Sequence, residues 1–270
     1  MNLKTHLVII DPQNDFCRSD GALFVQGADK DMERLAGMIN RCKEKLYDIH
    51  VTMDSHHLFH VAHPNAWVDS NGNNPAPFTM ITSSDVISGK WRASCPAFQN
   101  KWLEYVQSLE KNGRYVLVIW PPHCLIGSEG HNIYKSVWDE LTGWEKKFPG
   151  NIVDYITKGS NYSTEHYSAV QSDVPDPSDS STSLDMSPSG IINTLAKADV
   201  IALAGEALDY CMANTITDIA NNFGEDNIKK MVLLKDCTSS ITPGGDKETA
   251  FLNDLTTRGM RVMNSTEFLA

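Results

Sequence analysis

A cysteine follows a short apolar run in the stretch LAGEALDYCMANT, residues 203–215. A free cysteine is more often a small buried apolar residue than a nucleophile. Here, however, GEALDYC follows an expected strand and begins an expected helix, which places Cys211 in the first helical turn. The helix dipole and the free N–H groups of such a turn stabilise a thiolate, and the same N–H groups can hold a developing oxyanion. Cys211 is therefore a candidate nucleophile.

The other five cysteines lack this setting. Cys42 lies within an expected amphipathic helix, and the rest are scattered along the chain: Cys17, Cys95, Cys124 and Cys237. The sequence contains no CxxC pair and no spacing of a small disulfide-bonded domain, so we expect reduced thiols.

Two other candidate residues end apolar strands. Asp11 ends LVIID, where an unpaired carboxylate is costly, so it must have a partner or a raised pKa. Either state suits a proton shuttle, although Asp11 can equally well cap the turn that begins at Pro12. Lys158, in DYITKGSNY, ends a strand before a glycine. Such a lysine is usually solvated, but beside Cys211 and Asp11 it would favour the thiolate and orient the carboxylate.

The histidines gather after one strand. Four of the nine lie within eight residues: His56, His57, His60 and His63. Asp54 and His56 form a D-x-H pair at the strand end, and His123 follows Trp-Pro-Pro. One carboxylate and two imidazoles make a plausible site for Zn, Fe or Mn that keeps positions open for water or a ligand. A hydrogen-bonded polar cluster is the alternative; we prefer it for His57 and His63 and leave it open for His60.

The elements that must position these residues alternate along the chain. Six short apolar runs predict strands: HLVIID, DIHVTMD, YVLVIW, IVDYITK, DVIALAG and MVLLKD. Amphipathic stretches predict helices over 30–46, 96–111, 133–147, 209–222 and 246–258. This alternation predicts an α/β protein, a three-layer α/β/α Rossmann-like fold with a mostly parallel six-stranded sheet. Ligands bind at the carboxyl ends of such strands, where the candidate residues fall.

We expect a single domain over residues 1–270 with two inserts. Residues 61–95 carry Pro, Gly, Asn and two Trp without a clear period, and residues 172–190 are rich in Ser, Asp and Pro. We expect the first insert to pack over the metal side of the pocket and to narrow the substrate range. The second is a solvated loop, a lid or a subunit-contact arm, and the sequence leaves these alternatives open.

Composition limits the partners. The formal net charge is -11 and Lys and Arg are not clustered, which argues against a nucleic-acid-binding surface. No apolar run reaches the roughly 18 residues of a membrane helix, and the start MNLKTHLVIID turns acidic too soon for a secretory signal. We therefore expect a cytoplasmic protein with a small-molecule ligand, and neither nucleic acid nor membrane as a partner.

Taken together, these residues resemble the isochorismatase-like cysteine hydrolase superfamily and, within it, the nicotinamidases. The resemblance spans nearly the whole chain, and its motifs come in the expected order. They are DPQNDF with GALFVQGA from Asp11 onward, D-x-H at Asp54 and His56, WPPHC at Trp120 to Cys124, the lysine of YITKGSNY, and GEALDYC.

The resemblance implies a catalytic triad. Cys211 would be the nucleophile, Asp11 the general base and then acid, and Lys158 the electrostatic support. It also implies a cis peptide between Glu206 and Ala207, with the N–H groups of Ala207 and Cys211 forming the oxyanion hole.

The resemblance further implies a metal site and a pocket for a flat ring. Asp54, His56 and His123 match the ligands of one divalent transition ion, with Zn expected first and Fe or Mn as alternatives. His60 falls near a further family histidine and is the candidate fourth ligand. Phe16 and Trp120 match the aromatic walls of the pocket.

The activity implied is metal-dependent hydrolysis of nicotinamide to nicotinate and ammonia through a thioester, by a homo-oligomer. Two alternatives stay open: a cysteine amidase that acts on an N-carbamoyl or ureido substrate, and a catalytically silent binding protein. Three departures from the pattern leave the substrate undecided. Ser55 replaces a frequent Trp, 66 residues lie between His56 and His123, and Glu206 is an acid where an apolar residue is usual.

Overall fold

A parallel six-stranded sheet forms the centre of the computed structural model, which describes residues 3–112, 115–185 and 190–270. Its order is β10-β9-β8-β1-β2-β7, and every neighbouring pair is parallel. The strands are β1 (Thr5–Ile10), β2 (Leu46–Asp54), β7 (Asp154–Lys158), β8 (Val200–Gly205), β9 (Met231–Leu234) and β10 (Arg261–Met263).

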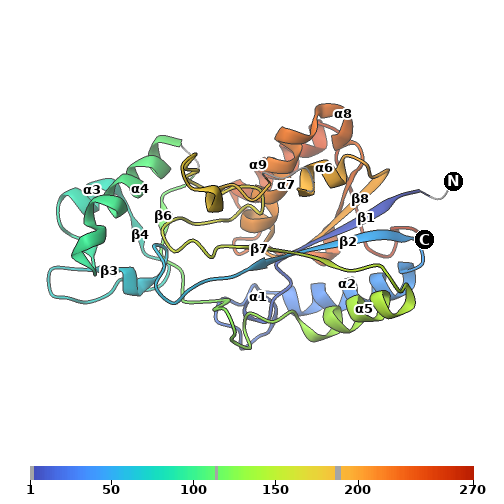
Figure 1. Ribbon diagram of the computed structural model, residues 1–270, viewed down its shortest axis with the longest axis horizontal. Coiled ribbons are helices and arrows are strands. Elements are labelled where there is room, and N and C mark those ends of the chain that lie inside the picture. The colour runs from blue at the N-terminus through green and yellow to red at the C-terminus, as the bar shows by residue number, and fades with distance from the viewer. Residues whose placement is uncertain (1–2, 113–114, 186–189) are drawn as a thin grey trace.

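Helices cover both faces of this sheet (Figure 1). One face carries α2 (Ala28–Cys42) and α5 (Lys135–Lys147), and the other carries α6 (Ile191–Leu195), α7 (Ala213–Phe223), α8 (Glu225–Ile228) and α9 (Asp246–Thr257). All of β1 and β9 is buried, as the continuous apolar runs of a sheet covered on both faces require. The predicted three-layer α/β/α fold is confirmed.

One predicted strand of the sheet was wrong. YVLVIW forms only β6 (Leu117–Val118), which pairs antiparallel with β4 (Met80–Ile81) outside the central sheet. The long first insert supplies that partner, and Pro121 and Pro122 then end the extended run because they have no N–H to donate to a ladder. The sixth place in the sheet belongs to β10, whose three partly exposed residues give little apolar signal.

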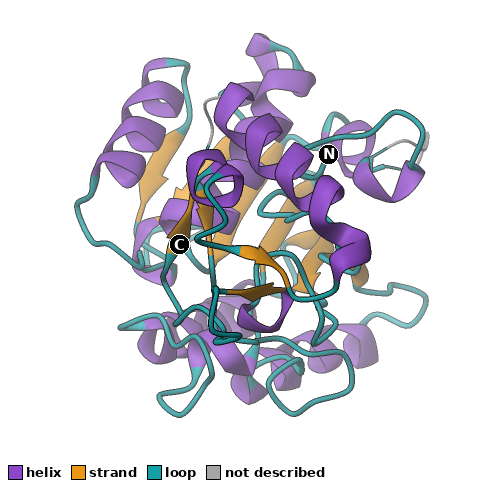
Figure 2. Ribbon diagram, turned by 90° about the vertical axis from the view of Figure 1, so that its left-hand side faces the viewer, coloured by secondary structure: helices purple, strands orange, loops and turns teal. Residues whose placement is uncertain are grey.

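The first insert and the helix after it form a lobe at the end of the molecule away from both termini (Figures 1 and 2). Its other elements are the 3-10 turns η1 (Pro64–Ala66) and η2 (Pro96–Phe98), the strands β3 (Trp67–Val68) and β5 (Arg92–Ala93), and the helices α3 (Ser83–Ile87) and α4 (Gln99–Asn112). Trp67 and Trp102 are fully buried and belong to the same hydrophobic core as the central sheet. The Thr82 hydroxyl and the Asp85 carboxylate form a capping box that starts α3.

The second insert packs against the chain that follows β7. Its described part, 172–185, contains the 3-10 turn η3 (Ser180–Thr182). Ser172 N donates a hydrogen bond to Thr182 O at 2.9 Å. The Asn161 amide donates to the Asp179 carboxylate at 3.1 Å and to the Ser181 hydroxyl at 2.9 Å. Residues 186–189 of this insert lie outside the described residues.

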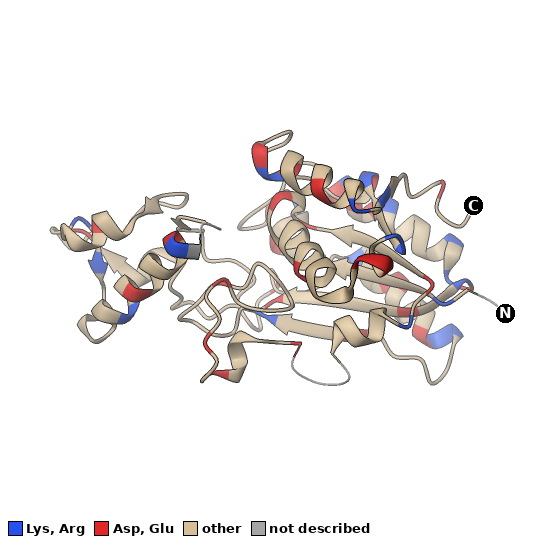
Figure 3. Cartoon of the chain, turned by 90° about the horizontal axis from the view of Figure 1, so that it is seen from above, with Lys and Arg blue, Asp and Glu red and all other residues tan. Residues whose placement is uncertain are grey.

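Charged residues of both signs are interspersed over the helices (Figure 3). Among the residues that the structure describes, no helix combines the length and the apolar character needed to cross a membrane.

Candidate active site

Neighbouring strands bring three charged side chains to one rim of the sheet. Asp11 follows the last residue of β1, Asp54 ends β2, and Lys158 ends β7 opposite Asp54 in the strand register. Because β2 lies between β1 and β7, the three side chains converge. Cys211 reaches the same point from the turn after β8, which pairs with β1 on its other side.

The Lys158 ammonium lies at the centre of this cluster. Its Nζ is 2.8 Å from Asp11 Oδ2, 3.1 Å from Asp54 Oδ1 and 3.5 Å from Cys211 Sγ. Its third donor position goes to the His166 carbonyl at 3.0 Å. The Lys158 side chain is fully buried, so water does not screen these contacts.

Burial and neighbouring charges set the protonation states. Burial raises the pKa of Asp11, since the lowering effect of Lys158 only partly offsets desolvation. Burial lowers the pKa of Lys158, but the charges of Asp11 and Asp54 outweigh it and hold that pKa well above its usual range. Burial raises the pKa of Cys211 well above its usual range, although Lys158 lowers it. The resting group is therefore a thiol, not the thiolate that the helix terminus suggested, and it needs a base when it attacks.

Two polar residues that the sequence did not single out hold the carboxylates. Asp11 has a left-handed backbone (φ 46°), and its Oδ1 accepts a 2.5 Å hydrogen bond from the Thr52 hydroxyl. The Gln13 amide donates to Asp54 O and accepts from Asp54 N, both at 2.7 Å. Gln13 is fully buried and thus fixes the end of β2 against the segment after β1.

Cys211 lies in a π-helical turn, η4 (Leu208–Met212), which continues directly into α7. The peptide between Glu206 and Ala207 is cis, as the resemblance implied. Gly205 precedes it with φ 121°, and a Cβ there would lie 2.0 Å from the Ile10 carbonyl, so only glycine fits between β8 and β1.

Glu206 is a buried acid that holds this turn in place. Its Oε2 accepts from Ser239 N at 3.0 Å, and Leu208 N donates to Ser239 O at 2.8 Å. Burial, reinforced by the charge of Asp31, raises the pKa of Glu206 well above its usual range, which favours the protonated, neutral acid. Glu206 therefore fastens the Ala207 turn to the 239 loop and does not face the substrate as a charge.

Asp54, His56 and His123 meet at one carboxylate oxygen. The Nε2 atoms of His56 and His123 lie 2.9 and 3.3 Å from Asp54 Oδ2. The Nδ1 atoms face the carbonyls of Gly159 at 3.1 Å and Pro121 at 2.8 Å, so the Nε2 atoms are turned toward the Asp54 oxygen. Nitrogens this close to a carboxylate oxygen need a proton or a cation between them, and the three residues fit a divalent transition ion when both Nε2 atoms are unprotonated.

The same need for positive charge appears in the protonation of the histidine. Burial lowers the pKa of His56, but the charge of Asp54 outweighs it and raises that pKa to about 9. Gly159 lets the chain after Lys158 pass close by, because a Cβ there would lie 2.7 Å from Asp54 Oδ1.

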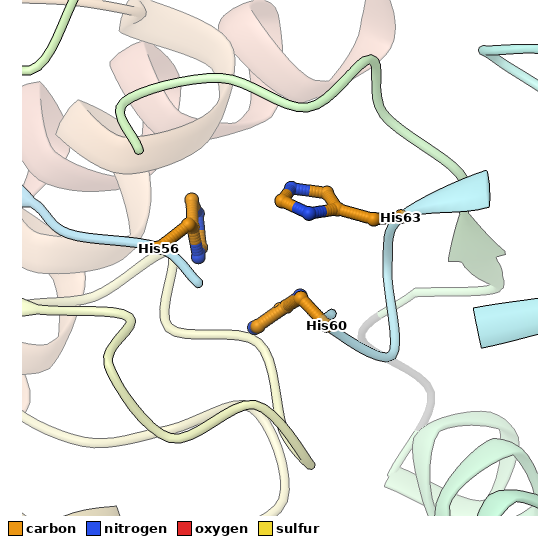
Figure 4. Close-up of side chains that lie close together, drawn as sticks. All are labelled: His56, His60 and His63. Atoms are coloured by element: carbon orange, nitrogen blue, oxygen red, sulfur yellow. The ribbon is translucent and has the colours of Figure 1, made fainter. Parts of the chain in front are cut away.

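Two further histidines adjoin His56, and their rings lie around one space (Figure 4). Both nitrogens of His60 have backbone partners: Nε2 faces Thr164 O at 3.2 Å, and Nδ1 accepts from Ala62 N at 3.2 Å. His63 Nδ1 faces Leu58 O at 3.1 Å, while its buried Nε2 has no hydrogen-bond partner among the described residues. His57 is exposed.

A small pocket opens beside Cys211. Its lining includes Phe16, Trp120, Asp54, His123 and Ala207, all singled out in the sequence, together with Cys211 itself. Sequence reasoning did not single out the five other lining residues: Leu23, Glu165, Tyr167, Tyr210 and Ile241. The Trp120 indole donates to the Tyr167 hydroxyl at 2.9 Å and meets the Tyr210 ring edge to face at 5.1 Å, so these tyrosines hold the aromatic wall.

Glu165 adds a second carboxylate to the metal side of this pocket. It is buried, and its Oε1 lies 3.8 Å from His56 Nε2. Its Oε2 has no hydrogen-bond partner among the described residues. No signal in the sequence marked it, because the loop after Lys158 has neither a period nor a motif at that position.

The fold is shared with solved nicotinamidase structures. The yeast nicotinamidase is 18% identical, with a TM-score of 0.63 over 96% of this chain and 99% of its own. A protein from L. infantum in complex with nicotinate is 19% identical (TM-score 0.59, 98% and 95% covered). The pyrazinamidase of Pyrococcus horikoshii in complex with zinc is 19% identical (TM-score 0.55, 97% and 99% covered). No protein-family model and no curated protein sequence matches the chain.

Proposed function

We propose that this chain is a metal-dependent cysteine amidase of the nicotinamidase type, which hydrolyses nicotinamide to nicotinate and ammonia. One observation carries the proposal: a buried ammonium contacts a carboxylate base, a thiol and a metal-side carboxylate at the edge of one aromatic pocket. The shared fold of the nicotinamidase structures, one with nicotinate and another with zinc, supports the same substrate class.

The first half of the reaction forms a thioester. Asp11 takes the thiol proton as Cys211 Sγ bonds to the carboxamide carbon, and the C=O electron pair moves to oxygen. The N–H groups of Ala207 and Cys211 hold this oxyanion, each contributing about 3 kcal/mol to the barrier reduction. As the C=O bond re-forms, the C–N bond breaks, and Asp11 gives its proton to the leaving ammonia.

The second half restores the enzyme. Asp11 takes a proton from a water molecule while the oxygen of that water bonds to the thioester carbon. The resulting tetrahedral adduct then expels Cys211 Sγ, which receives the proton from Asp11, and nicotinate is released. Lys158 stays protonated throughout and stabilises whichever of Asp11 and Cys211 carries the negative charge.

The pocket walls orient the substrate. Phe16 and Trp120 enclose the flat ring, which sets the carboxamide against Cys211. Asp54, His56 and His123 would hold the metal ion, and a Zn²⁺ bound there supplies a Lewis acid that attracts the ring nitrogen.

Ammonia release from purified protein tests the proposal. Nicotinamide, pyrazinamide and N-carbamoyl compounds are compared with added Zn²⁺ and after treatment with a chelator. We expect nicotinamide turnover that chelation abolishes and Zn²⁺ restores, and a loss of at least about a thousandfold in Cys211→Ala and Asp11→Asn. Turnover of N-carbamoyl compounds alone, independent of metal, would instead identify the other class of cysteine amidase. No turnover of any compound would point to a binding protein.

A further inference from the structure

A second cluster of metal-ligating side chains lies at the opposite end of the sheet. His6 in β1 is the register partner of Asp48 in β2, and His50 in β2 is the partner of Asp154 in β7. Paired residues of parallel strands point to the same face, and residues two apart along one strand do so as well. All four side chains therefore share one face. His6 lies five residues before Asp11, roughly 16 Å along the strand, so this cluster is separate from the candidate active site.

The atoms of this cluster are spaced as metal ligands. His6 Nδ1 lies 3.0 Å from His50 Nε2, and Asp48 Oδ2 lies 3.9 Å from the same His50 nitrogen. One ligand atom from each of these three residues lies within 4.8 Å of the others. Two imidazoles and one carboxylate form a three-ligand set that leaves a fourth position open, as in many zinc and iron sites.

The surroundings complete the arrangement. Asp154 Oδ2 lies 3.0 Å from His50 Nδ1, which is the carboxylate–histidine contact that orients a metal-binding imidazole. Both rings are buried, whereas the Asp48 side chain is 32% exposed, so an ion can reach the cluster from solvent.

We propose that His6, Asp48 and His50 form a second binding site for a divalent transition ion at the end of the sheet away from the pocket. Asp154 orients the His50 ring, and the bound ion bridges β1 and β2. This site is independent of the proposed amidase activity. Its ion joins neighbouring strands and contacts no substrate, so we expect it to stabilise the fold.

Zinc binding to a protein without its active-site ligands tests this site. In His56→Ala/His123→Ala, titration with Zn²⁺ after removal of metal should show one bound ion per chain. Adding Asp48→Ala, whose side chain is partly exposed and easily replaced, should weaken that binding at least tenfold. Zn²⁺ should also raise the midpoint of thermal unfolding of the double variant, and that rise should shrink with Asp48→Ala. Anomalous X-ray scattering at the zinc edge should place the ion between His6 and His50.

Two results would overturn the proposal: no zinc bound by the double variant, or zinc binding that Asp48→Ala leaves unchanged. Because the double variant lacks two of the candidate active-site metal ligands, these results do not depend on whether the proposed amidase activity is found. Asp48→Ala in the otherwise unchanged chain should leave ammonia release at the level of the parent protein, since Asp48 lies outside the pocket. His50→Gln provides a second removal of a ligand, and circular dichroism shows whether each variant is folded.

Discussion

The surroundings of Lys158 severely restrict which side chain can occupy its position. A fully buried ammonium is tolerable only because two carboxylates and a carbonyl surround it. Its partners in turn depend on it, since Asp11 and Asp54 would otherwise be buried charges without compensation. The contact with Cys211 is the one on which the proposed catalytic role of Lys158 rests.

Replacing this lysine should therefore affect stability and chemistry together. Lys158→Met leaves two buried carboxylates unpaired, and we expect a loss of about 3–5 kcal/mol in the free energy of unfolding. Because Lys158 lowers the pKa values of Asp11 and Cys211, its removal should also slow alkylation of Cys211. Denaturant unfolding and timed labelling measure the two effects.

The matched control is Lys135→Met, which removes an exposed lysine paired with Asp139 on α5. Exposed ion pairs contribute little, so it should change stability by no more than about 0.5 kcal/mol. Equal losses in the two variants would mean that the Lys158 cluster does not hold the folded state together.

The two histidines beside His56 should differ in their effect on metal binding. His63 resembles His56 in donating Nδ1–H to a carbonyl and keeping Nε2 without a partner, whereas both nitrogens of His60 are engaged. We expect His63→Ala to weaken zinc binding at least tenfold, and His60→Ala to weaken it less. Competition with a chromophoric chelator measures both affinities.

Exposed His57 supplies the control, because His57→Ala should leave the zinc affinity unchanged. A larger loss in His60→Ala than in His63→Ala would favour His60 as the fourth ligand, the possibility that the resemblance raised and the sequence left open.

At the scale of elements, the turn between β8 and α7 is built by residues on both sides of the cis peptide. The Glu206 carboxyl accepts from Ser239 N, and Leu208 N donates to Ser239 O. The Asp209 carboxylate accepts from Ile241 N and Thr242 N, both at 2.9 Å. Ile241 lines the pocket. Glu206 is thus part of the scaffold that places Ala207 and Cys211, whose N–H groups are the proposed oxyanion donors.

The neutral state of Glu206 predicts how stability changes with pH. Because its folded-state pKa is raised, Glu206 makes a contribution to the free energy of unfolding that is fully present below the unfolded-state pKa of about 4.3. This contribution declines as pH rises toward the folded-state pKa. Glu206→Gln keeps an oxygen that accepts from Ser239 N but cannot ionise. The stability of the parent protein relative to this variant should therefore fall by up to about 1.4 kcal/mol per pH unit above pH 4.3.

Denaturant unfolding of both proteins across this range measures the difference. Glu104→Gln, on an exposed face of α4, corrects for the loss of one carboxylate from the molecule. A difference that stays constant or grows with pH would mean that Glu206 is ionised in the folded state.

The elements also show what local sequence can and cannot predict. Five apolar runs became strands of the sheet, four of them largely buried and the fifth, β7, an exposed edge strand, and their ends placed Asp11, Asp54 and Lys158 at one rim. β10 was missed because its three residues carry no period, and YVLVIW was misassigned because an apolar run does not show which strand will pair with it. Gln13 and Thr52 were missed because each acts through a partner about forty residues away, which no local pattern records.

At the scale of the whole molecule, the lobe contacts Trp120, a residue of the pocket wall. The lobe residue Ala62 accepts a hydrogen bond from Trp120 N at 2.8 Å, and Phe78 lies against the Trp120 ring edge to face at 5.9 Å. Trp120 lines the pocket from its other side. The lobe can therefore affect which ring fits the pocket, and the narrower substrate range expected from residues 61–95 stays a prediction.

Removing the Phe78 ring tests whether this support sets selectivity. Phe78→Ala should let Trp120 move outward, so the preference for nicotinamide over a methyl-substituted nicotinamide, measured as a ratio of kcat/KM values, should fall. One methylene in a fitted pocket is worth roughly 10- to 200-fold, so a loss of a few-fold to tenfold is expected. Ile87→Ala removes another exposed apolar side chain of the lobe, on α3, and should leave the ratio unchanged. If both variants keep the ratio of the parent protein, the support that Phe78 gives to Trp120 has no part in selectivity.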